Sequence, residues 1–116
     1  MKRTGLACLL LAACAPPKGR HGYAHIDHLD YAVDRCQLEP VRSIFELSGD
    51  GTARIIRDPT GTRLDVRPAR ARRNQVWFYM CVDDPPLPWN APSGDLRLLC
   101  RHATGRLRVT VHFDCR

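Results

Sequence analysis

The stretch Arg106-Leu107-Arg108-Val109-Thr110-Val111-His112-Phe113-Asp114-Cys115 decides the fold class, because polar and apolar residues alternate along its whole length. Successive side chains of a β-strand point to opposite faces, so a period of two predicts a strand with one buried and one solvated face. Residues 95–101 place Leu96, Leu98 and Cys100 on one side of an extended segment, and residues 102–105 supply a short turn. The two segments are therefore predicted to form a hairpin.

Four more strands are expected upstream, at residues 43–47, 52–57, 62–66 and 76–82. The first three are separated by Ser48-Gly49-Asp50-Gly51 and Asp58-Pro59-Thr60-Gly61, whose residue types are typical of turns. Residues 76–82 are apolar in both alternating sets, which is typical of a central strand buried on both faces. This pattern predicts a mainly β protein, either a small antiparallel β-barrel or a sandwich.

One segment is nearly as compatible with a short helix as with a strand. Across residues 39–47 the apolar side chains also fit one helical face, Pro40 suits a first helical turn, and Gly49 suits the position after the last turn. The sequence leaves this choice open.

The N-terminal segment has the features of an export signal. Lys2 and Arg3 precede an apolar run over residues 5–13, which is shorter than the roughly 20 residues of a transmembrane helix. Its end, Leu11-Ala12-Ala13-Cys14, resembles the lipobox of bacterial lipoprotein precursors in all four positions. The resemblance implies that residues 1–13 are a removed signal peptide and that Cys14 carries a lipid anchor with palmitate-type acyl chains. The alternative is an ordinary cleaved secretory signal in which Cys14 is incidental.

The same resemblance implies a location. Lipoproteins retained in the inner membrane tend to have aspartate after the lipidated cysteine, whereas this chain has Ala15. We therefore expect a protein anchored in the bacterial outer membrane and facing the periplasm. Residues 14–24 are expected to form the lipidated N-terminus and a tether, and residues 25–116 a single small β-rich domain.

Four of the six cysteines lie in the expected domain: Cys36, Cys81, Cys100 and Cys115. An even number of cysteines in an oxidising compartment predicts two disulfides, for which three pairings exist. A hairpin turn near residues 103 and 104 places position 100 opposite about 107, far from Cys115. This register favours Cys81 with Cys100 and Cys36 with Cys115. A zinc site is disfavoured, because no two of these cysteines stand two to four residues apart.

The chain is basic, with a formal net charge of +6 and sixteen arginines against two lysines. No acid occurs between Val66 and Val82, where Arg67, Arg70, Arg72 and Arg73 lie close together. Such a loop could bind lipid phosphates or an acidic protein, because guanidinium groups pair with phosphate and carboxylate. Nucleic acid is not expected as a partner in the periplasm. A solvated basic loop with no fixed partner is the alternative.

The segment Asp83-Asp84-Pro85-Pro86-Leu87-Pro88-Trp89-Asn90-Ala91-Pro92 is a second candidate for partner binding. Prolines hold it extended, and Leu87 and Trp89 offer apolar surface for a groove on another protein. The alternative is a rigid loop across the end of the barrel, with Trp89 over the core.

A histidine-rich run supplies weak candidates for metal binding: His21, His25, Asp27 and His28. Catalytic patterns are missing from the sequence, because there is no Gly-x-Ser-x-Gly elbow and the adjacent carboxylates of Asp83 and Asp84 point apart on an extended segment. We therefore predict no enzyme and no cofactor. The expected function is that of a non-enzymatic, lipid-anchored, protein-binding module of the cell envelope: an inhibitor, an immunity-type factor or an accessory subunit. The alternative is a ligand or metal carrier that uses the histidine-rich run.

Overall fold

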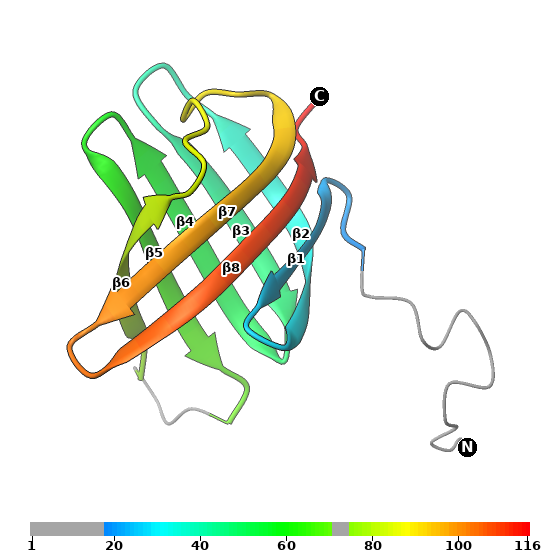
Figure 1. Cartoon of the computed structure of the whole chain (residues 1–116). Coiled ribbons are helices and arrows are strands. Elements are labelled where there is room, and N and C mark those ends of the chain that lie inside the picture. The colour runs from blue at the N-terminus through cyan, green and yellow to red at the C-terminus, as the bar shows by residue number, and fades with distance from the viewer. Residues whose placement is uncertain (1–17, 71–74) are drawn as a thin grey trace, which may run out of the picture.

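The computed structural model describes residues 18–70 and 75–116, and every regular element in them is a β-strand. The strands are β1 (Gly22–Ile26), β2 (Leu29–Leu38), β3 (Ser43–Gly49), β4 (Gly51–Asp58), β5 (Gly61–Pro68), β6 (Trp77–Asp83), β7 (Ser93–His102) and β8 (Gly105–Asp114). Each strand pairs antiparallel with the next, and β8 pairs with β1 to close a barrel (Figure 1). The predicted β fold is confirmed, and it is a barrel rather than a sandwich.

The structure decides one choice that the sequence left open and corrects one expected boundary. The helix considered at residues 39–47 does not form, because β3 occupies Ser43–Gly49 and pairs on both sides. Residues 22–24, expected in the tether, belong to β1. β1 is only five residues long, and β2 carries an irregularity between Val33 and Arg35 that interrupts its alternation. β1 and β2 therefore lack the regular side-chain pattern by which the other six strands were predicted.

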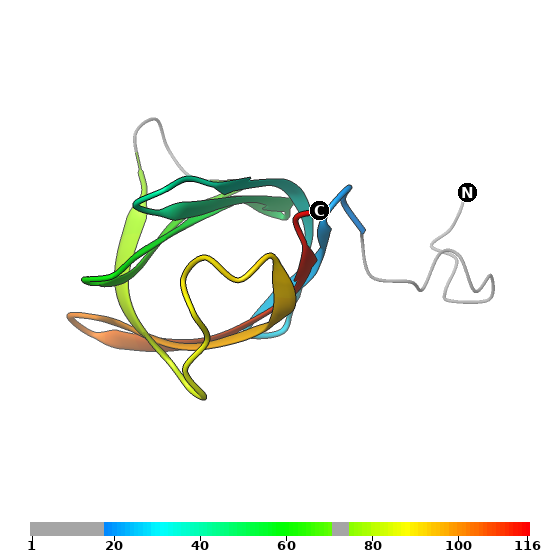
Figure 2. The same ribbon diagram turned by 90° about the horizontal axis from the view of Figure 1, so that it is seen from above.

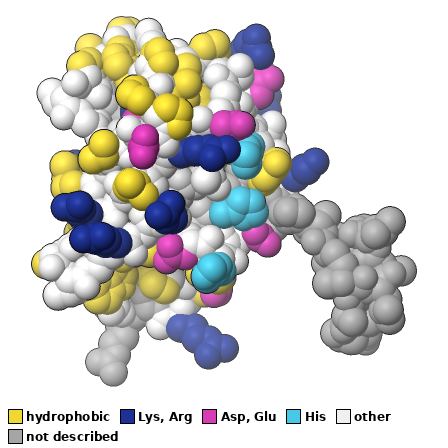
Figure 3. Space-filling model, in the orientation of Figure 1, with side chains coloured by type: hydrophobic (Ala, Val, Ile, Leu, Met, Phe, Trp, Pro, Cys, Tyr) yellow, Lys and Arg dark blue, Asp and Glu magenta, His cyan; other side chains and the backbone are white. Residues whose placement is uncertain are grey.

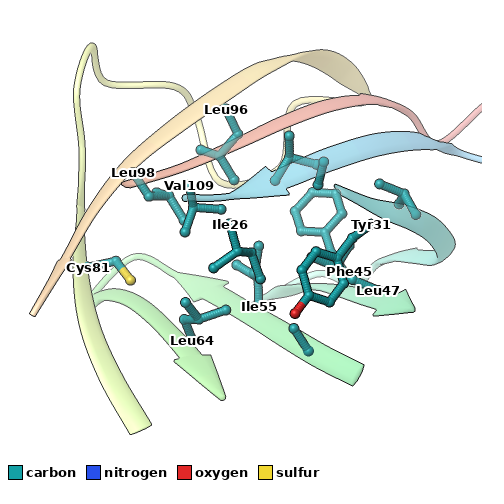
Figure 4. Packing of buried hydrophobic residues seen from close by; sticks show 14 of the residues in the cluster. Ile26, Tyr31, Phe45, Leu47, Ile55, Leu64, Cys81, Leu96, Leu98 and Val109 are labelled. Atoms are coloured by element: carbon teal, nitrogen blue, oxygen red, sulfur yellow. The ribbon is translucent and has the colours of Figure 1, made fainter. Parts of the chain in front are cut away.

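The barrel interior is filled by the apolar side chains that point inward from all eight strands, as expected for a barrel of this size (Figure 4). Phe45 packs edge-on against Phe113, which links β3 to β8 across the interior. Each described strand pairs with two neighbours, although the β6–β7 pairing covers only residues 80–83 of β6 and the β1–β2 pairing only residues 29–32 of β2. No helix in the described part of the chain is long and apolar enough to cross a membrane.

Both predicted disulfides are present. Cys81 and Cys100 are direct partners in the β6–β7 register, and Cys36 on β2 bonds to Cys115 just beyond β8. Cys100 lies opposite Leu107, as the expected hairpin turn requires. The bonds therefore join β6 to β7 within the core and attach the chain end to β2.

The connection between β6 and β7, residues 84–92, crosses one end of the barrel, and we call it the lid. Figure 2 looks down on this end, where the segment passes over the barrel interior. Its Asp84–Pro85 peptide bond is cis. The opposite end of the barrel is formed by the β1–β2, β3–β4 and β7–β8 turns.

Candidate functional site

The lid is held down by a buried arginine. Arg57 lies at the end of β4 with its side chain inside the barrel and only 1% exposed. Its Nη2 donates to Oδ2 of Asp83 at 2.5 Å and to the carbonyl of Leu87 at 2.6 Å. The Ser43 hydroxyl donates to the carbonyl of Trp89 at 2.7 Å. These charge-assisted and neutral hydrogen bonds fix the lid backbone to β3, β4 and β6.

The two lid residues predicted to bind a partner have different surroundings. Leu87 packs against the barrel core, and Trp89 is half-buried. The segment therefore crosses the barrel end, as the alternative interpretation expected, but Leu87 rather than Trp89 is the residue that packs against the core. Leu87 stabilises that closure, and a role for Trp89 in partner binding stays a prediction.

The predicted basic loop is described in part. Arg67 is exposed near the end of β5, and Arg70 follows shortly after that strand. Arg72 and Arg73 lie outside the described residues. Arg67 lines the same surface hollow as the carboxylates of Asp34, Glu46 and Asp65. Arg54 lines this hollow too, and two of its carboxylates already pair with other arginines, Glu46 with Arg35 and Asp65 with Arg63. A role for Arg67 and Arg70 in partner binding stays a prediction.

The histidine-rich run does not converge on one point. His25 lies on the outer face of β1 with Nδ1 2.6 Å from Oδ1 of Asp30, and Nδ1 of His21 lies 3.0 Å from the carbonyl oxygen of Asp114. Asp27, in the β1–β2 turn beside His28, accepts a hydrogen bond from the backbone N–H of Arg108 at 3.1 Å. Within residues 18–70 and 75–116 no group of three or more candidate metal ligands comes together. The geometry of these four candidates gives the metal hypothesis no support.

The structure places an apolar stripe where the sequence predicted a strand buried on both faces. Phe78, Met80 and Val82 point outward from β6 and are 58%, 65% and 67% exposed. Leu99 of β7 lies directly opposite Val82 and is also exposed. The prediction was wrong because a closed barrel has one interior, so the second apolar set of β6 has nothing to pack against. In a barrel, a strand with apolar residues on both faces must expose one set, so the sequence of β6 already indicated an apolar surface patch.

Arginines border this stripe. Met80 lies in register between Arg63 of β5 and Arg101 of β7, while Leu99 lies opposite Arg108 of β8. We call the combined surface the β6–β8 face. It consists of Phe78, Met80, Val82, Leu99, Arg63, Arg97, Arg101, Arg106 and Arg108. In Figure 3, hydrophobic and basic side chains are interleaved over β7 and β8.

Most of these arginines have no acidic partner. Arg63 lies 3.6 Å from Asp65, but none of the four arginines on β7 and β8 is within ion-pair distance of a carboxylate among the described residues. Each described strand already pairs with two neighbours, which favours recognition by side chains over strand addition. The β6–β8 face supplies apolar groups that burial would stabilise and guanidinium groups that can pair with carboxylates. Comparisons with known proteins assign the chain to no family, since no family model, no curated protein and no solved structure matches it.

Proposed function

We propose that this protein is a small lipid-anchored lipoprotein of the bacterial cell envelope that acts non-enzymatically by binding another protein through its β6–β8 face. The observation that supports this function best is the exposed stripe of Phe78, Met80 and Val82 beside arginines of β7 and β8 that have no acidic partner in the described part of the chain. The proposed lipid anchor and the proposed location on the periplasmic side of the outer membrane are based on the lipobox resemblance at Leu11-Ala12-Ala13-Cys14. An inhibitor, an immunity-type factor and an accessory subunit all fit such a module.

The chemistry of the face defines the partner surface. Aromatic residues, methionine and arginine are the types enriched in the buried centre of protein interfaces, and single such residues can contribute about 2 kcal/mol or more to binding. Loss of Lys2 and Arg3 with the signal peptide lowers the formal net charge from +6 to about +4, so the mature chain stays basic. The partner is therefore a protein with an apolar patch bordered by aspartate and glutamate.

A binding experiment on the intact, lipid-anchored protein tests this function. The tagged protein is cross-linked in intact envelopes, the captured partner is identified, and its affinity is measured with both proteins purified. Met80→Glu removes the centre of the stripe, and Arg101→Glu reverses a bordering charge. Thr52→Glu adds the same acid at an exposed position on the outer side of β4 and serves as the matched control.

The expected result is one stoichiometric partner whose affinity falls at least about 10-fold with Met80→Glu and with Arg101→Glu but is unchanged with Thr52→Glu. Affinity should also weaken as salt rises, because exposed charges are screened. Equal affinity of all three variants would overturn the proposal. So would a result in which no protein is captured and the two face variants instead lose binding to vesicles of anionic lipid.

A further inference from the structure

The barrel end opposite the lid is an open cup of about 330 Å³. Its walls come from the β1–β2 and β3–β4 turns, the end of β5 and the starts of β6 and β8. The lining residues are Ile26, Asp27, Leu29, Tyr31, Asp50, Val66, Pro68, Trp77, Tyr79 and Leu107. This volume lies at the lower end of the range of about 300–1,000 Å³ that small-molecule pockets occupy.

The cup differs in charge from the rest of the molecule. The chain has eighteen basic residues, yet among the described residues that line the cup there are two carboxylates, Asp27 and Asp50, and no lysine or arginine. Three aromatic side chains, those of Tyr31, Trp77 and Tyr79, share the same walls. Aromatic faces and carboxylates both attract cations.

The aromatic walls are held in place. The rings of Trp77 and Tyr79 both contact the ring of His102, with centroids 5.5 Å and 5.6 Å apart. Tyr31 is 1% exposed and lies among the core side chains (Figure 4), and among the described residues its hydroxyl makes one hydrogen bond, a long one of 3.5 Å to the carbonyl oxygen of Asp50. An ordinary O–H···O bond is about 2.7–2.8 Å, so this buried hydroxyl has unused hydrogen-bonding capacity.

The carboxylates act on both phenols. Burial, and then the charge of Asp50, raise the pKa of Tyr31, while burial and then the charge of Asp27 raise the pKa of Tyr79. The backbone N–H of Asp27 donates to the carbonyl of Arg108 at 2.8 Å, and its Oδ1 accepts from the N–H of Arg108, which fixes the carboxylate at the rim. Oδ2 of Asp27 has no hydrogen-bond partner among the described residues, so it can contact a ligand.

We propose that the cup binds an organic ammonium group carried on a short apolar body. The carboxylates of Asp27 and Asp50 and the aromatic faces attract the cation, and the aliphatic walls bury the carbon chain. None of the residues that line the cup belongs to the β6–β8 face, so this site goes beyond the proposed protein-binding function. The ammonium-binding proposal and the protein-binding proposal can therefore fail independently. The ammonium group could belong to a free amine or to a zwitterionic lipid headgroup.

Tryptophan fluorescence of the full chain tests the proposal. A Trp89→Phe background leaves Trp77 as the reporter, because the chain has two tryptophans. The probes are hexyltrimethylammonium, hexyl sulfate and hexanol, which share a chain and differ in charge. Hexyltrimethylammonium should give a saturable change, with an affinity at least about 10-fold above that for hexyl sulfate. Equal affinity for the two ions, or no saturation with the cation, would overturn the proposal.

Neutral variants locate the site. Asp27→Asn and Asp50→Asn should each lower the affinity for hexyltrimethylammonium at least about 3-fold, and together at least about 10-fold. Asp84→Asn makes the same charge change in the lid and should leave affinity unchanged. Equal losses from all three variants would overturn the proposal, because they would show a general charge effect. Circular dichroism monitors folding, and if Asp27→Asn disturbs its turn, Asp50→Asn is sufficient for the test, because the Asp50 side chain has no described contact.

Vesicles distinguish the two sources of the ammonium group. Binding of the lipid-free chain to phosphatidylcholine vesicles that is lost with Asp50→Asn assigns the site to a headgroup. Binding of soluble hexyltrimethylammonium without vesicle binding assigns it to a free amine. Failure of both probes contradicts the inference while leaving the protein-binding proposal intact.

Discussion

Arg57 and Asp83 form an ion pair inside the barrel beneath the lid, with the arginine side chain 1% exposed and the aspartate side chain 18% exposed. The pair joins the end of β4 to the end of β6, and Arg57 also donates to the carbonyls of Leu87 and Pro88. The Nε atom of Arg57 has no hydrogen-bond partner among the described residues. The buried charge therefore depends on Asp83 for its compensation.

Removing the charge of Asp83 should be strongly destabilising. Asp83→Asn leaves the guanidinium of Arg57 buried without a counter-ion, and we expect a loss of about 3–5 kcal/mol in the free energy of unfolding. Asp84→Asn, next in the chain but without a described side-chain partner, should change it by less than about 0.5 kcal/mol. Urea unfolding of the disulfide-intact protein measures both values.

The double variant Arg57→Met with Asp83→Asn separates the ion pair from general damage to the lid. It should recover part of the loss, because no uncompensated charge stays buried. Equal destabilisation by Asp83→Asn and Asp84→Asn would show that the pair contributes little.

The two disulfides should contribute unequally to stability. The Cys36–Cys115 bond spans 79 residues and the Cys81–Cys100 bond spans 19. In the chain-entropy model these loops stabilise the fold by about 4.5 and about 3 kcal/mol. Replacing both cysteines of the longer loop by alanine should therefore cost about 1 kcal/mol more than replacing both of the shorter. Peptide mapping of unreduced protein checks the pairing, and a fragment that joins Cys100 to Cys115 would contradict it.

Acid should weaken the β4–β5 turn through Asp58. The Thr60 hydroxyl, the backbone N–H of Thr60 and that of Gly61 all donate to Oδ1 of Asp58, and these bonds lower the pKa of this carboxyl below 3.8. The unfolded chain therefore takes up this proton at a higher pH than the folded chain. The stability that Asp58 contributes is present above about pH 3.8 and is lost as the pH falls through the folded pKa.

Asp58→Asn keeps the acceptor oxygen and removes the titration. Between about pH 4 and pH 2, the free energy of unfolding of this variant should fall less steeply with decreasing pH than that of the native chain. Urea unfolding as a function of pH measures the slope. Identical slopes, or a carboxyl resonance of Asp58 that titrates at or above pH 3.8, would contradict the assignment.

The proposed anchor depends on one thiol. Cys14→Ser should block lipid attachment and release the protein from the membrane fraction, because serine cannot form the thioether. Metabolic labelling with a palmitate analogue should mark the native protein and not the variant. Cys8→Ser, within the expected signal peptide, is the matched control and should stay labelled. Native protein recovered unlabelled and soluble would show that the segment is an ordinary secretory signal.

The sequence by itself determined that the fold is mainly β, excluded one of the three disulfide pairings and favoured the pairing that the structure has. Residues 106–115 alternate without interruption, residues 95–101 place Leu96, Leu98 and Cys100 on one side, and the short turn between them sets Cys100 opposite Leu107 and keeps it from Cys115. These features are local, because side-chain parity along a strand and the length of a turn need no information from the rest of the chain.

Only the tertiary structure decided which apolar and charged residues face solvent. The second apolar set of β6 became surface, and Arg57 became interior, because barrel closure fixes one inner face for every strand whatever its composition. The cup likewise unites Asp27, Asp50 and Trp77 from turns and strand ends that are far apart in sequence. Sites of this kind depend on how distant strand ends meet around the barrel, and no pattern within a single strand encodes that arrangement.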